Sequence, residues 1–149
     1  MDKAALRRGE QQIRRMLGAE YGSQMRRAWR TLEPEFERYV VGFLAGEIWR
    51  RPRLPLKVRS LVTVAALAAL GRTEALALNV RMAVNNGASP GEVRETLLQL
   101  APYAGFPACW GGLVVADRVF QEMESARSAA RSNAALTAFC TAAVRTANA

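Results

Sequence analysis

"LALNVRMAVNNGASPGEV", residues 76–93, decides how this chain folds, because it holds an amphipathic helix, its stop signal and the start of the next helix. Asn86-Gly87 is a typical end for the first helix. Ser89-Pro90-Gly91-Glu92 then supplies an N-cap, a first-turn proline and a capping-box acid. The stretch therefore predicts two consecutive helices joined by a tight turn.

One polar residue interrupts the apolar face of the first of these helices. Asn79 is in line with Leu76, Val80 and Ala83 at helical spacing. A buried side-chain amide without partners is unfavourable by roughly 1–3 kcal/mol, so a core position should not hold one without a reason. We therefore treat Asn79 as a candidate functional residue.

The rest of the chain also has helical patterning, with Gly and Pro at intervals of one helix length and no period-2 alternation. The fold class is predicted to be all-α. The helix predicted over 57–70 is nearly all apolar after Arg59, which favours a central helix buried on most sides. The other predicted helices begin near residues 3, 23, 33, 73, 89 and 108, with Thr73 as a cap.

The domain organisation follows from length and composition. A chain of 149 residues with 50% apolar and 23% charged residues is typical of one globular domain, here residues 1–125. Residues 126–149 are rich in Ala, Arg, Ser and Thr, yet Leu136, Phe139, Cys140 and Val144 keep a helical spacing. This tail is predicted to be a docking helix or a frayed end.

Several classes of protein are disfavoured by composition. The longest apolar run, residues 61–70, is about half the ~20 residues needed to span a membrane, and no apolar stretch follows the basic N-terminus. We expect a cytoplasmic protein without membrane attachment. With no histidine and only two distant cysteines, a metal or dithiol site is not expected either.

The net charge of +8 suggests nucleic acid until its distribution is considered. The excess lies in residues 1–30 and 126–149, whereas residues 31–125 are balanced. A DNA-binding domain normally carries its basic patch on a folded element that reaches a groove. We therefore expect no nucleic-acid partner and assign the basic ends to solvated faces, subunit contacts or attraction of small anions.

A second polar residue on an apolar stripe is Glu47, at helical spacing from Phe36, Val40 and Phe43 in the helix predicted over 33–49. Desolvation there would disfavour the charged carboxylate, which is a common route to a catalytic acid or base. The alternative is an ion pair with Arg50, Arg51 or Arg59. Nearby, Gly42 and Gly46 permit close approach of another helix or of a ligand, and we favour helix packing.

Further side chains are candidates for one shared cavity, although no spacing rule requires it. They are Asn79, Arg81, Asn85, Tyr103 and Trp110.

The order of these segments resembles the carboxymuconolactone decarboxylase family, relatives of the alkylhydroperoxidase AhpD. The resemblance covers roughly residues 7–123 and rests on "GEIWRRP" (46–52), "RSLVTVAALAALGR" (59–72), "NNG" (85–87) and "YAGFPA" (103–108). It implies a compact AhpD-like helical subunit that assembles as trimers or hexamers, with active sites near helix ends and interfaces.

The departures from the family are equally informative. The decarboxylases usually carry histidine at the position of Asn79 and another in the stretch that here reads Cys109, Trp110, Gly111. In the peroxidase branch, the Cys-x-x-Cys motif would fall at Arg72 and Ala75. Thiol-dependent peroxidase activity is therefore not expected.

The resemblance implies that the protein decarboxylates a small lactone acid without a cofactor. Loss of carbon dioxide leaves an enolate, which requires a proton donor and groups that stabilise an oxyanion. The implied catalytic residues are Glu47 as acid/base and Asn79 as hydrogen-bond donor, since an amide cannot shuttle protons near neutral pH. The implied substrate-binding residues are Trp49, Arg51, Arg59, Asn85, Tyr103 and Trp110.

Two hypotheses stay open. The chain is either a cofactor-independent decarboxylase, isomerase or cyclase acting on a lactone acid or polyketide-like molecule, or a non-catalytic binding or assembly protein. Polar residues at the family's site positions favour the enzyme, because polar groups in an inactive site tend to be replaced by apolar ones. The missing histidines and the basic tail favour the second.

Overall fold

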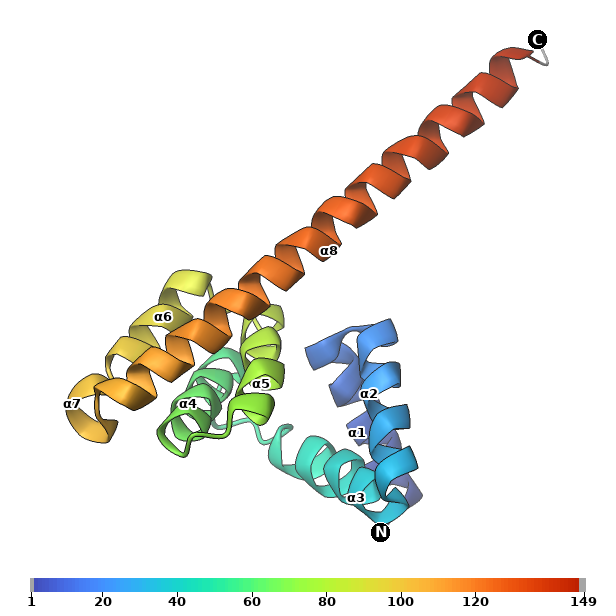
Figure 1. The fold of residues 1–149 in the computed structure, drawn as a ribbon. Coiled ribbons are helices and arrows are strands. Elements are labelled where there is room, and N and C mark those ends of the chain that lie inside the picture. The colour runs from blue at the N-terminus through green and yellow to red at the C-terminus, as the bar shows by residue number, and fades with distance from the viewer. Residues whose placement is uncertain (1, 148–149) are drawn as a thin grey trace.

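The computed structural model describes residues 2–147 of the chain and the side chains of residues 2–134. Every regular element in this part is helical, which confirms the all-α prediction. Figure 1 shows the elements, which are α1 (Lys3–Leu17), α2 (Ala19–Leu32), α3 (Pro34–Arg38), the π-helix η1 (Tyr39–Ile48), α4 (Leu56–Ala69), α5 (Thr73–Asn85), α6 (Pro90–Leu98), α7 (Ala101–Ala104) and α8 (Phe106–Ala147). Among the described helices, none is long and apolar enough to cross a membrane.

Local capping signals end α1 and α5 and start α6 where the sequence predicts, whereas α2 begins at Ala19, earlier than the predicted start near residue 23. Gly18 follows α1 with a φ of 84°, and Gly87 follows α5 with a φ of 96°. At the start of α6, the Ser89 Oγ accepts from the Glu92 N–H at 3.1 Å, and the Ser89 N–H donates to the Glu92 carboxylate at 2.8 Å. The predicted capping box is confirmed. Thr73, in contrast, is the first residue of α5 and not its cap.

The helix predicted over residues 33–49 is found over residues 34–48, but most of it is a π-helix, which was not predicted. After the short α3, the chain continues as η1, in which hydrogen bonds span five residues, as in Trp49 N–H to Leu44 O at 3.0 Å. The buried face of η1 carries Val41, Ala45 and Trp49, four residues apart. Of the predicted stripe, Val40 is partly buried, whereas Phe36, Phe43 and Glu47 are exposed.

Glycines let α1 and η1 pack backbone to backbone. A Cβ added to Gly46 would lie 2.6 Å from the Ala5 carbonyl oxygen, and one added to Gly9 would overlap the Val41 carbonyl. Gly42 is also buried. The prediction that this segment admits close approach of another helix is confirmed.

Two apolar clusters meet at α5. The larger joins α4, α5, α6 and α8 around Val64, Val80, Leu97 and Ala116. The smaller joins α1, η1 and α5 around Ile13, Met16, Val41, Trp49 and Met82. The central element is therefore α5, which contributes to both. The prediction that residues 57–70 are buried on most sides is wrong, because Val62 and Leu70 are exposed on α4.

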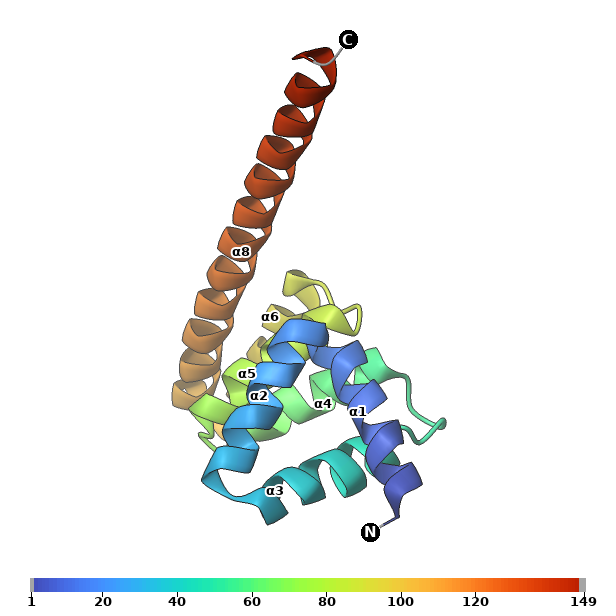
Figure 2. The same ribbon diagram turned by 90° about the vertical axis from the view of Figure 1, so that its right-hand side faces the viewer.

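The last helix extends far beyond the body of the molecule (Figures 1 and 2). It runs without interruption across the predicted boundary at residue 125, and the side chains of residues 124–134 are exposed. The packing face predicted for residues 136–144 lies outside the side chains that the structure describes.

Candidate functional site

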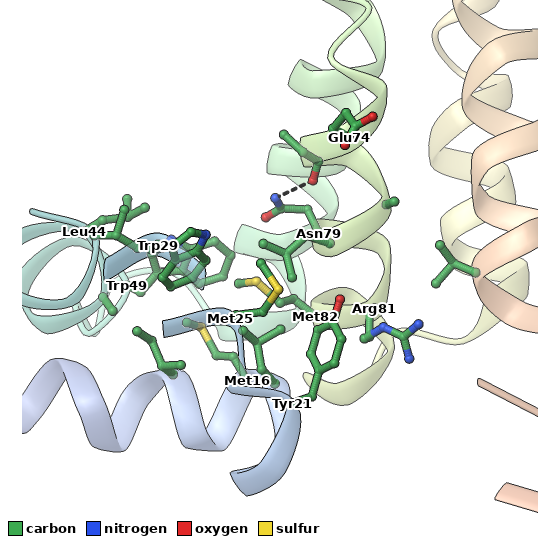
Figure 3. Close-up of a pocket in the computed structure, with 18 of the residues that line it drawn as sticks. Met16, Tyr21, Met25, Trp29, Leu44, Trp49, Glu74, Asn79, Arg81 and Met82 are labelled. Carbon is green, nitrogen blue, oxygen red and sulfur yellow. Dashed lines mark hydrogen bonds between the residues drawn. The ribbon is translucent and has the colours of Figure 1, made fainter. Parts of the chain in front are cut away.

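The main candidate site is a cavity of about 550 Å³ between α5 and the N-terminal helices. Figure 3 shows its predominantly apolar side chains projecting from α1, α2, η1 and α5, among them Met16, Met25, Trp29, Leu44, Trp49 and Met82. A cavity of this size and character suits a small organic ligand.

Asn79 borders this cavity, as its position on the apolar face predicts. Its Nδ2 donates to the Ala75 carbonyl oxygen at 2.8 Å, one turn earlier in α5. The amide projects from α5 toward the side on which Trp29 and Leu44 lie (Figure 3). Because an amide has two N–H groups and an oxygen, the second N–H and the oxygen are left for a ligand.

Charged residues also line the cavity. Arg81 donates from Nη2 to Glu122 of α8 at 2.9 Å, and its guanidinium lies 4.9 Å from the centre of the Tyr21 ring. Glu74, exposed in the first turn of α5, is another lining residue. The positive charge of Arg81 is therefore already paired, whereas no ion pair involves Glu74 within the part of the chain described.

The sequence indicated that Asn79 and Arg81 could line one cavity, but it did not indicate the two carboxylates that also line it, Glu74 and Glu122. Glu74 is five residues before Asn79, so the sequence indicates only weakly that the two side chains lie near the same cavity. Glu122 meets Arg81 across 41 residues of sequence, and no local pattern could reveal that contact.

Glu47 is not part of this cavity in the single chain. Its side chain is exposed, and within residues 2–134 no ion pair joins it to Arg50, Arg51 or Arg59. Neither of the two environments predicted for it, a desolvated stripe or an ion pair, is found. Glu47 lies off the buried face of this helix, which carries Val41, Ala45 and Trp49.

Trp49 is buried at 6% exposure and separates the cavity from a smaller pocket. That second pocket is lined by Gln12, Arg15, Arg50 and Arg51, among others. The Arg51 carbonyl accepts from Arg59 Nη2 at 3.0 Å.

Two buried donors near this second pocket have no partner among the described residues. They are Gln12 Nε2 and Arg59 Nε. Since a buried donor without an acceptor is unfavourable by roughly 1–3 kcal/mol, both are unusual for a purely structural site.

The remaining predicted residues lie away from the cavity. Asn85 donates from Nδ2 to the Met16 carbonyl oxygen at 2.8 Å, which ties the end of α5 to α1. Tyr103 and Trp110 are 81% and 72% exposed, on α7 and the start of α8. Of the eight predicted site residues, the single chain brings together Trp49 and Asn79 at the cavity.

Comparison with known proteins identifies relatives with named activities. Residues 34–118 match the carboxymuconolactone decarboxylase family. The chain is 40% identical over 89 residues to 4-carboxymuconolactone decarboxylase of Acinetobacter baylyi, a match covering 60% of this chain and 66%, slightly under two thirds, of that protein. It is 31% identical over 108 residues to the nitrosuccinic acid decarboxylase npaB of Metarhizium robertsii, covering 72% of this chain and 76% of that protein.

The name of a third relative states no activity. The chain is 31% identical over 98 residues to an uncharacterised 15.0 kDa protein of Paracoccus denitrificans, covering 64% of this chain and 73% of that protein. The family match begins at residue 34, so it includes Trp49 and Asn79 but not α1 and α2, which form one wall of the cavity.

Proposed function

The chain belongs to the carboxymuconolactone decarboxylase family, and on that basis we propose that it is a decarboxylase-like enzyme that needs no cofactor. Its substrate is a small carboxylated lactone or a polyketide-like acid. Isomerisation and ring closure of such molecules are variants of this proposal, in which a base removes a proton from carbon to form an enolate and no carbon dioxide is lost. The observation that carries it is the apolar cavity with the Asn79 amide at its edge.

The chemistry follows from that environment. The bond between the carboxylate and its neighbouring carbon breaks, carbon dioxide leaves, and the electron pair passes into a conjugated carbonyl to form an enolate. A hydrogen bond to the enolate oxygen is stronger in an apolar cavity than in water, and the second Asn79 N–H is the proposed donor. The carbon that gains a proton must receive it from another group, because Asn79 has none to transfer.

Two carboxylates are candidates for that proton transfer. Glu74 lines the cavity in the single chain. Glu47 is exposed, but it stands on a helix whose Phe43 and Leu44 are also exposed, so a subunit packed against η1 would cover it. We retain Glu47 as the proposed acid/base of the assembled protein and Glu74 as its alternative.

Assembly as a homo-oligomer, a trimer or hexamer, is part of this proposal. Support comes from the large apolar side chains that the single chain leaves exposed, including Leu70, Tyr103, Phe106 and Trp110. Contiguous exposed apolar surface is typical of protein interfaces. Tyr103 and Trp110 would then act at a subunit contact. Light scattering on the purified protein tests this, and a monomer would contradict it.

The experiment that tests the function measures carbon dioxide release from 4-carboxymuconolactone and from nitrosuccinic acid, the compounds named for the relatives. We expect release from one of them or from a related lactone acid. If Glu47 transfers the proton, Glu47→Gln should reduce the rate of carbon dioxide release by about 100-fold or more. If Glu74 transfers it, Glu74→Gln should cause the same loss. Glu95→Gln, an exposed change on α6, is the matched control.

A non-catalytic binding or assembly protein is the second candidate function. The complete absence of histidine favours it, because the family's decarboxylases use that residue for proton transfer. Tight binding of these acids without carbon dioxide release, unchanged by either glutamate substitution, would support it over the enzyme.

A further inference from the structure

The smaller pocket behind Trp49 has the composition of an anion site. It has a volume of about 270 Å³ and lies between α1 and the connector from η1 to α4. Figure 2 shows that connector looping out beside α1. Side chains from both segments line it, namely Gln12 and Arg15 of α1 and Arg50 and Arg51 of the connector.

The positive charge in this pocket is not neutralised. No acidic residue lines it, and Arg15, Arg50 and Arg51 have no carboxylate partner among residues 2–134. Elsewhere in the same region, Arg26, Arg30 and Arg38 are all paired with glutamates. Three arginine residues that line one pocket without a counter-charge attract anions, and each guanidinium is a planar fork that fits a carboxylate or phosphate.

A buried hydrogen-bond donor provides independent evidence. Gln12 is only 4% exposed, lines the pocket, and has no acceptor for its Nε2 within the described residues. Buried amide donors nearly always have an acceptor. Arg59 donates from Nη2 to the Arg51 carbonyl, and its buried Nε also has no acceptor within the described residues. The missing partner beside Gln12 is thus an acceptor, and the surrounding arginines favour one that is negatively charged.

We propose that this pocket binds a small oxyanion, a carboxylate or phosphate group, held by the Gln12 amide and by the guanidinium groups of Arg15, Arg50 and Arg51. Its volume of about 270 Å³ is below the roughly 300–1,000 Å³ of pockets for drug-sized ligands and is ample for a small oxyanion. Trp49 lines both this pocket and the Asn79 cavity, and it is the one residue that they share among those that line them.

The test is calorimetric titration of the full-length protein with inorganic phosphate and, separately, with succinate, at constant ionic strength maintained with chloride. We expect one of the two to bind with one anion per chain. Tighter phosphate binding would identify a phosphate ligand, and tighter succinate binding a carboxylate. Arg15→Gln and Arg50→Gln should each weaken binding by about tenfold or more, because each removes a charge-assisted hydrogen bond.

Gln12→Leu should weaken binding to a similar extent while the protein stays folded, since the substitution removes a buried donor that has no partner. Both arginine variants change exposed side chains, so they test the proposal even if Gln12→Leu fails to fold. Arg8→Gln is the matched control, because Arg8 is exposed on the same helix and carries the same charge but does not line the pocket.

Two results would overturn the proposal. One is binding of neither anion beyond chloride. The other is an equal loss of binding in Arg8→Gln and Arg15→Gln, which would show attraction by net charge only. Because the readout is anion binding and not carbon dioxide release, its failure is distinguishable from failure of the proposed function.

Discussion

The Asn85 side chain donates a hydrogen bond to the Met16 carbonyl oxygen at 2.8 Å, across 69 residues of sequence. This bond joins the last turn of α5 to the last turn of α1, and Met16 itself belongs to the smaller apolar cluster. A residue that the family resemblance assigns to substrate binding thus has a structural partner in the single chain.

Substitution of Asn85 should therefore affect stability more than catalysis. Asn85→Ala leaves the Met16 carbonyl without its side-chain donor, and we expect the free energy of unfolding to fall by about 1 kcal/mol. Urea denaturation measures this, with Gln24→Ala, an exposed change on α2, as the control. Loss of substrate binding with unchanged stability would instead assign Asn85 to the site.

Substitution of Asn79 should have the opposite effect. Asn79→Leu removes the proposed donor to the enolate oxygen while keeping an apolar cavity wall, so the rate of carbon dioxide release should fall by about 100-fold or more. The free energy of unfolding should change by about 1 kcal/mol or less, because the Ala75 carbonyl remains within a helix. Unchanged turnover in the leucine variant would exclude this role for Asn79.

The contact between α1 and η1 should not tolerate a side chain at Gly46. A Cβ there would lie 2.6 Å from the backbone oxygen of Ala5, so Gly46→Ala should lower the free energy of unfolding by about 1–3 kcal/mol. Gly111→Ala is the matched control: Gly111 is inside α8 with nothing within 4 Å of the added Cβ, and the change should stabilise by about 0.5–1 kcal/mol. Thermal and urea unfolding of both variants measure the change in the free energy of unfolding. Equal changes in the two variants would contradict the backbone contact between α1 and η1.

The start of α6 should show a defined pH dependence. The hydrogen bond from the Lys57 ammonium, 2.8 Å from the Glu92 carboxylate, and that from the Ser89 backbone N–H lower the pKa of Glu92. Because this pKa is lower in the folded state, ionised Glu92 stabilises the fold at pH values above the ordinary glutamate pKa. That stabilisation is lost as the pH falls through the lower pKa of the folded state.

Glu92→Gln should accordingly be less stable than the parent at pH 7, and the difference should disappear under acidic conditions below the ordinary glutamate pKa of about 4.3. Urea unfolding at a series of pH values measures the difference. Glu95→Gln, on the same helix, provides the comparison. A gap that stayed constant from pH 7 to pH 3 would contradict the assigned ion pair.

The helix ends were predictable from sequence because each depends on a few adjacent residues. Gly18 and Gly87 adopt positive φ values that glycine reaches easily, and the Ser89–Glu92 capping box closes within four residues. The position of Asn79 at a cavity was also predictable, because a single polar residue on an α-helical apolar face can be recognised from the 3.6-residue period alone.

The tertiary structure decided what depends on distant segments. The face of η1 that packs on α1 carries Gly46, and Glu47 is left exposed, against the prediction that it lies on a desolvated stripe. The pairing of Arg81 with Glu122 and the meeting of Gln12 with Arg50 likewise join segments about 40 residues apart. Sequence by itself therefore determined the all-helical class, the ends marked by Gly18, Gly87 and the Ser89–Glu92 capping box, and the family. Only the packing of those helices decided which polar side chains share a pocket, because hydrogen-bond partners and burial are set by neighbours in space that no local spacing records.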